Sequence, residues 1–142
     1  MQKIILTFFI ATVSLNCFCQ SIWVIDFAKT KDNKRQEMLY YIENNWKAYR
    51  DAALREGYIK SYLVLETIAD TTNDYNFILL TEFPDSASLA KVEENFGPIM
   101  KKLSPNGPSL LNSSMPGDFR LLLPYKEAAT VFSSSNKKSK NK

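Results

Sequence analysis

The side chains of this sequence that could carry out chemistry are charged residues set inside short apolar runs. Asp26 lies in IWVIDFA, Glu66 in YLVLET and Arg120 in DFRLLL. A carboxylate in apolar surroundings has a raised pKa and can accept a proton, and an arginine can hold an anionic or enolate-like oxygen. These three residues are therefore our candidates for acid–base catalysis on an activated carbon acid.

Composition excludes most other kinds of catalytic centre. The sequence has no histidine, and its only cysteines are Cys17 and Cys19. Ordinary zinc, copper or iron sites need these ligands, and so do Ser-His-Asp and Cys-His catalysis. A carboxylate site for Ca²⁺ or Mg²⁺ stays open, but no Asp-x-Asp-x-Asp-Gly loop and no glycine-rich phosphate loop occurs. We therefore expect no metal and no cofactor.

The two cysteines belong to an N-terminal segment that is typical of a secretory signal peptide. Lys3 is followed by an apolar run over residues 4–13 and a short polar end. Cleavage before Gln20 would remove residues 1–19 and both cysteines, so we expect a periplasmic or extracellular protein. Lipidation of Cys17 or Cys19 is a minority alternative, because neither is preceded by a well-fitting lipoprotein pattern. The run is too short to be a stable membrane anchor.

The positive charge of the chain is concentrated at its ends. The formal net charge is +3, but residues 133–142, SSSNKKSKNK, hold four lysines and no acid. Without that tail and Lys3, 13 basic side chains remain against 15 acidic ones. We therefore expect no nucleic-acid partner, a disordered tail over 133–142 and a single domain over 20–132.

Four strands are predicted by alternating apolar residues and turn signals. They cover residues 22–29, 58–69, 75–83 and 118–125. The polar turn DTTND joins the middle two as a hairpin.

Two helices are predicted between these strands. Apolar residues three and four apart, from Met38 to Ala53, indicate a helix over 33–56 that Asp32 or Asn33 can cap and Gly57 can end. Asp85 can cap a second helix. The Pro and Gly residues of 97–117 make that stretch a loop or a broken short helix.

The resulting order, strand-helix-strand-strand-helix-strand, is that of the ferredoxin-like α+β fold. Its four-stranded antiparallel sheet has the spatial order fourth, first, third, second, with both helices on one face. Strand alternation predicts one face under the helices, with Trp23, Ile25, Phe27, Ile59, Ser61, Leu63, Leu65, Phe77, Leu79, Phe83, Phe119, Leu121 and Leu123. The remaining set is predicted to form the open face, with Val24, Asp26, Tyr62, Val64, Glu66, Asn76, Ile78, Leu80, Glu82, Arg120 and Leu122.

An open face with this apolar middle should be covered, and a second copy of the sheet is the economical cover. At one end of it the antiparallel order predicts a polar row of Arg120, Asp26, Asn76 and Glu66. The structural explanation is a cross-strand Arg120–Asp26 ion pair. The functional explanation is the acid–base site described above. In that site the apolar walls, together with the polar groups of Tyr62 and Asn76, bind a small ligand. The ligand-binding candidates are Tyr62, Asn76, Val64, Ile78, Leu80 and Leu122.

Over residues 22–125 the chain resembles the dimeric α/β-barrel superfamily, which includes the antibiotic-biosynthesis-type monooxygenases. The resemblance rests on the element order, the long first helix and TEFPDSASLAKVEENF as a third strand leading into a capped helix. It implies two facing sheets, with a pocket inside the barrel or between sheet and helices. Haem-degrading members rely on a histidine that this chain does not have, so haem chemistry does not transfer.

Three functions stay open from the sequence. The first is an exported homodimer that binds a small apolar or anionic ligand without catalysis. The second is a cofactor-independent monooxygenase or isomerase. The third is an interaction domain that docks another protein through the open sheet face.

Overall fold

A computed structural model describes residues 20–67 and 75–133 of the 142-residue chain. The predicted signal peptide, the hairpin tip and residues 134–142 of the predicted tail lie outside the described residues. The elements are β1 (Ile22–Thr30), α1 (Arg35–Tyr41), the π-helical η1 (Ile42–Lys47), α2 (Ala48–Arg55), β2 (Ser61–Glu66), β3 (Phe77–Phe83), α3 (Ser86–Ala90), α4 (Val92–Leu103), α5 (Pro116–Phe119) and β4 (Arg120–Ala129). The predicted order of strands and helices is confirmed.

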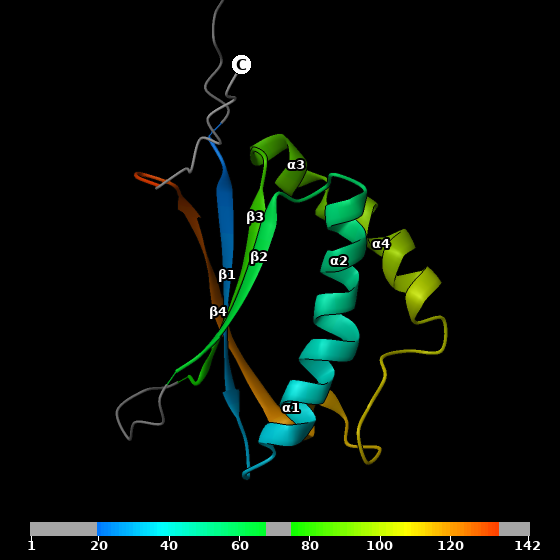
Figure 1. The fold of residues 1–142 in the computed structure, drawn as a ribbon. Helices are drawn as coiled ribbons and strands as arrows, with labels where there is room; N and C mark the ends of the chain where they lie inside the picture. The colour runs from blue at the N-terminus through cyan, green and yellow to red at the C-terminus, as the bar shows by residue number, and fades with distance from the viewer. Residues whose placement is uncertain (1–19, 68–74, 134–142) are drawn as a thin grey trace, which may run out of the picture.

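The four strands form one antiparallel sheet in the order β2-β3-β1-β4, as predicted. Figure 1 shows α1, α2 and α4 on one side of this sheet and no helix on the other side. Within the described ranges, no helix has the length and apolar character needed to cross a membrane.

The first helical segment is continuous from α1 through η1 to α2, because Ile42, Trp46 and Tyr49 all face the core. Its start differs from the prediction. Asp32 and Asn33 have positive φ values of 49° and 58° and form a left-handed turn, and the cap position is Lys34. The end agrees with the prediction, because Gly57 has a φ of +75°.

The second helical segment is longer than predicted. Asp85 caps α3 as expected, its carboxylate accepting a hydrogen bond of 2.6 Å from the Ser88 backbone amide. Helix α4 then continues through Pro98 to Leu103, because Phe96 and Ile99 pack against the buried cluster that includes α2 residues. The stretch from 97 to 117, which was predicted to be a loop or a broken short helix, is therefore helical at both ends. Strand β4 begins and ends later than predicted.

The predicted assignment of the two sheet faces is wrong for three of the four strands. Buried Leu79 and Thr81 of β3 pair with Asp26 and Val24, so these β1 residues face the helices. The β2–β3 and β1–β4 registers extend this assignment to the other two strands. They place on the helical side of the sheet a set that was predicted for the open face, namely Tyr62, Val64, Glu66, Arg120 and Leu122. In the β1–β3 and β2–β3 registers, each odd-numbered residue pairs with an even-numbered one. The prediction had placed residues of the same parity on the same face in all four strands, and this is why it was wrong.

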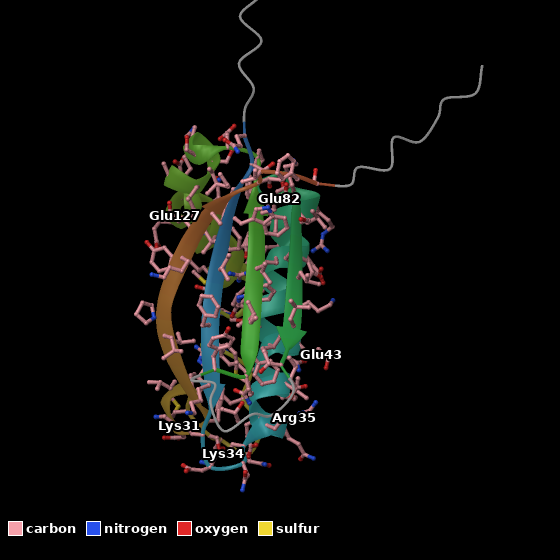
Figure 2. All side chains as sticks on the ribbon, turned by 90° about the vertical axis from the view of Figure 1, so that its left-hand side faces the viewer. Lys31, Lys34, Arg35, Glu43, Glu82 and Glu127 are labelled. Carbon is pink, nitrogen blue, oxygen red and sulfur yellow. The ribbon has the colours of Figure 1, made fainter. Side chains whose placement is uncertain are left out.

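The open face is consequently more apolar than predicted. Ile78 and Leu80 lie on it as expected, and the register adds Trp23, Ile25, Phe27, Leu63, Leu65, Leu121 and Leu123. Leu63, Leu65 and Leu121 are 47%, 44% and 46% exposed. Figure 2 looks onto this face. A contiguous apolar surface of this kind marks an interaction surface.

Candidate functional site

A cleft lies between the sheet and the helices, where the helical layer leaves β4 uncovered. It consists of two adjoining cavities of about 320 and 230 Å³ that share Asp26, Tyr49, Arg50 and Met100. The larger cavity extends toward α3 and α4 and ends at two acids; its other lining residues include Val24, Thr81, Phe83, Leu89, Val92, Glu93, Phe96, Tyr125 and Glu127. The smaller extends toward α1 and is lined further by Met38, Tyr41, Trp46, Leu79, Arg120 and Leu122.

Asp26 lies where the two cavities meet. Its carboxylate makes no ion pair and no hydrogen bond with any part of the chain that the structure describes. Burial raises the pKa of Asp26, and the positive charges of Arg50 and Arg120 oppose this increase. A partly buried carboxylate without a partner is costly for folding, so it is a candidate functional group.

The backbone beside Asp26 is irregular in a way that supports this assignment. The β1–β4 register pairs Ile25 with Lys126 but Phe27 with Leu123, so Pro124 and Tyr125 together lie opposite Asp26. Proline has no amide hydrogen for the ladder, and this β-bulge accommodates it. Bulges are common next to active sites because they redirect side chains. Here the bulge places Tyr125 in the cleft as well as Leu122.

Arg50 is the residue of the cleft that the sequence analysis missed. Its Nε donates to Thr81 Oγ1 at 3.1 Å and its Nη1 to the Trp46 carbonyl at 3.4 Å. The guanidinium carbon lies 3.8 Å from the centroid of the Trp46 ring. Burial lowers the pKa of Arg50 to about 10, and Asp26 opposes this shift. The available signal was its position four residues after Trp46, beside Tyr49 on the buried stripe.

Arg120 also lies in the cleft, where it does not form the ion pair that was one of its two predicted roles. It pairs in register with Thr30, and the expected cross-strand ion pair with Asp26 does not form. Its guanidinium carbon instead lies 4.1 Å from the centroid of the Tyr41 ring. Asp26 and Arg120 therefore line one cavity without neutralising each other directly.

The other members of the predicted polar row lie elsewhere. Glu66 accepts two hydrogen bonds of 2.6 and 2.7 Å from Arg35 at the surface, and these lower the pKa of its carboxyl. Asn76 accepts from the Thr30 backbone amide at 2.7 Å and donates to its hydroxyl at 3.1 Å. Both residues hold neighbouring elements together.

Most of the predicted ligand-binding residues also lie outside the cleft. Tyr62 donates a short hydrogen bond to Asp51, and its ring meets Trp46 edge-on with 5.7 Å between centroids. Val64 packs against the core, and Ile78 and Leu80 lie on the open face. Leu122 is the one residue of the six that lines the cleft.

The loop over residues 104–115 closes one end of this region. Tyr49 donates to Ser104 at 2.8 Å, and the fully buried Asn45 binds both backbone groups of Ser109, accepting at 2.7 Å and donating at 2.8 Å. Gly107 and Pro108 line a further cavity of about 300 Å³ beside Tyr41 and Tyr49. The loop is thus fixed to the helices by hydrogen bonds.

In the part of the chain that the structure describes, no cluster of acidic, histidine or cysteine side chains is placed to hold a metal ion. No family model and no curated protein sequence matches the chain. Among solved structures, HapK from Hahella chejuensis is similar with a TM-score of 0.52 and 11% identity over 80% of this chain and 96% of that one. The fold is ferredoxin-like.

Two other structures are similar at lower scores. A DABB family protein with a ferredoxin-like fold from Mesorhizobium loti has a TM-score of 0.47 and 14% identity over 81% of this chain and 99% of that one. A dimeric ferredoxin-like protein of unknown function from Thermobifida fusca has a TM-score of 0.46 and 14% identity, with coverage of 82% and 96%. At such identities the similarity concerns the ferredoxin-like fold alone.

The partial burial of Asp26 has a consequence for stability. The pKa of Asp26 is higher in the folded protein than in the unfolded chain, where it is about 4. Protonation of Asp26 therefore stabilises the fold, and this contribution is complete below the unfolded pKa. It is lost as the pH rises through the folded pKa. We expect Asp26→Asn to be about 1 kcal/mol more stable than the wild type at neutral pH, with the difference shrinking in acid. Urea denaturation at several pH values measures this. Equal wild-type and variant stabilities at neutral pH would contradict it.

Proposed function

We propose that this protein binds a small, largely apolar molecule in the sheet–helix cleft. The observation that supports this most directly is the Asp26 carboxylate, which has no hydrogen bond or ion pair within the described residues and has two arginines nearby. The cavity around it is otherwise lined mainly by apolar and aromatic side chains. Apolar walls with a few converging polar groups are typical of small-molecule sites, and the adjoining cavities are of suitable size.

We also propose that the functional form is a homodimer whose two sheets face each other. The support is the open face, where nine apolar side chains from all four strands form one surface without a covering helix. A second copy offers an identical apolar surface, and face-to-face sheets can interdigitate their side chains. The cleft lies on the other side of the sheet, so the dimer leaves it accessible.

Ligand binding can be tested with N-phenylnaphthylamine, an uncharged aromatic probe that fluoresces in apolar sites. We expect saturable binding of one probe per chain. Val92→Trp fills the larger cavity and should abolish this binding, whereas Ala90→Trp on the exposed side of α3 should retain it. Binding that is insensitive to Val92→Trp would place the probe elsewhere and contradict the proposed site.

A second candidate function is enzymatic, and the position of Asp26 favours it. A carboxylate with a raised pKa beside two cations can remove a proton from a carbon acid, and the arginines can stabilise the resulting oxygen anion. Asp26→Asn distinguishes the two functions, because it would remove turnover of any substrate while binding of the uncharged probe persists.

We further propose that residues 20–142 act outside the cytoplasm. The support is Lys3 and the apolar run that follows it, in a pattern typical of a secretory signal. The intact mass of the protein recovered from its native cells tests this: an N-terminus at Gln20 is expected. An added lipid mass on a cysteine would instead indicate a lipoprotein.

A further inference from the structure

We infer that the ligand of the cleft is an amphipathic organic acid whose anionic group sits beside Arg50 and Arg120, with its apolar body in the larger cavity. This inference rests on the proposed function and adds the chemical class of the ligand and its direction in the cleft.

Arg50 is held in a fixed position by the fold and has N–H groups that remain available to donate hydrogen bonds to a ligand. Its Nε and Nη1 are engaged with Thr81 and Trp46, and its stacking on the Trp46 ring fixes the plane of the guanidinium. Within the described residues, Nη2 makes no hydrogen bond or ion pair. A rigid guanidinium with free N–H groups in a half-buried cavity suits a carboxylate or a similar oxygen anion.

Arg120 supplies the second positive charge. Its guanidinium stacks on Tyr41 and has no ion pair or hydrogen bond in the described part of the chain. The smaller cavity thus contains two arginines and the single carboxylate of Asp26, which leaves a net positive charge at that end of the cleft. Charged groups away from bulk water interact strongly, so this charge favours an anion.

The acidic residues of the cleft set the direction of the ligand. Glu93 and Glu127 line the larger cavity only, whereas Arg120 lines the smaller cavity only. An anionic group is repelled from the first end and attracted to the second. The larger cavity offers Phe83, Leu89, Val92 and Phe96 to an apolar body.

Asp26 lies next to the proposed position of the anion and opposes it when ionised. In its neutral form it can donate a hydrogen bond to the anion instead, and burial favours that form. Asp26→Asn keeps a donor of similar shape and removes the negative charge, so it should strengthen anion binding.

Two probes with the same apolar body test this inference. Anilinonaphthalene sulfonate carries an anionic group, and N-phenylnaphthylamine does not. For each variant we take the ratio of the affinity for the sulfonate to the affinity for the neutral probe. Arg120→Met should lower this ratio about tenfold or more, and Asp26→Asn should raise it several-fold, since hydrogen bonds to charged groups contribute roughly 1.5–3 kcal/mol. Arg35→Met, which removes a surface arginine paired with Glu66, should leave the ratio unchanged.

The outcomes separate the inference from the proposed function. An unchanged ratio in both Arg120→Met and Asp26→Asn, with neutral-probe binding still blocked by Val92→Trp, would overturn the anion site and leave the cleft as an apolar site. If neither probe bound, or if Val92→Trp did not reduce the binding of either probe, the proposed function itself would be overturned. Val92→Trp also checks that the sulfonate is not reporting on the open sheet face.

Discussion

Replacing Leu63 with glutamate is expected to convert the proposed dimer into a monomer. Leu63 lies on the open face halfway along the edge strand β2, where it pairs with Leu80 of β3. It is 47% exposed in the single chain, so the new carboxylate reaches water there and folding is unaffected. In a symmetric dimer both copies bring this charge into the apolar interface. An uncompensated buried charge costs about 3 kcal/mol or more, which corresponds to a dissociation constant more than a hundredfold higher.

Light scattering over a dilution series measures the mass of each form, and Leu54→Glu is the matched control. Leu54 is 43% exposed but lies on α2, on the helical side of the molecule, so the same substitution at similar exposure should leave the dimer intact. A dimer that survives Leu63→Glu would contradict sheet-to-sheet assembly. A monomeric wild type would do so as well, and it would leave the open face as the docking surface of a different protein.

The second large effect is expected at Asn45. This side chain is fully buried, and its amide binds the backbone of Ser109 in both directions and the Tyr41 carbonyl at 3.2 Å. Asn45→Ala leaves an amide and a carbonyl of the 104–115 loop without their partner and opens a cavity. We expect a loss of about 3 kcal/mol of unfolding free energy and faster proteolysis within this loop.

Asn44→Ala is the control for this prediction. Asn44 is exposed and makes a single hydrogen bond of 2.9 Å to the Tyr40 carbonyl, so its loss should cost less than about 0.5 kcal/mol. Urea denaturation and limited proteolysis compare the two variants. If both had the same stability and the same cleavage rate, Asn45 would not be what holds the loop on the helices.

The order of the elements was predictable because each has a local signal. The stripe from Met38 to Ala53, the stop at Gly57 and the cap at Asp85 act within a few residues and do not depend on the sheet. The continuation of α4 through Pro98 was not predictable in this way. It depends on contacts of Phe96 and Ile99 with the core, which outweigh the local preference of proline to end a helix.

The alternation of residues along the strands could not predict which face of the sheet lies against the helices, because both faces are apolar. In β1, Trp23, Ile25 and Phe27 are larger than Val24 and Ala28, yet the smaller residues face the helices. Only the register with β3, where every second residue from Phe77 to Phe83 is buried, decides between the two arrangements.

The proximity of Asp26 and Arg120 was predicted, but not the face of the sheet on which they lie. Both line one cavity, which is on the helical side of the sheet and not on the open face. Glu66 and Asn76 do not join them, because each has a stronger local partner in Arg35 and Thr30. Arg50 was missed because an arginine on a helix is ordinarily exposed, and its burial depends on Trp46 and Thr81 folding around it.

The bulge at Pro124 divides β4 into two halves that present residues of opposite parity to the cleft. Before the bulge, even-numbered residues such as Arg120 and Leu122 face the cleft; after it, odd-numbered residues such as Tyr125 and Glu127 do so. The first half borders the end where the arginines lie, and the second borders the end near α3 and α4. Substitutions at Tyr125 and Glu127 can therefore reshape the end of the cleft near α3 and α4 while the end with the two arginines is kept.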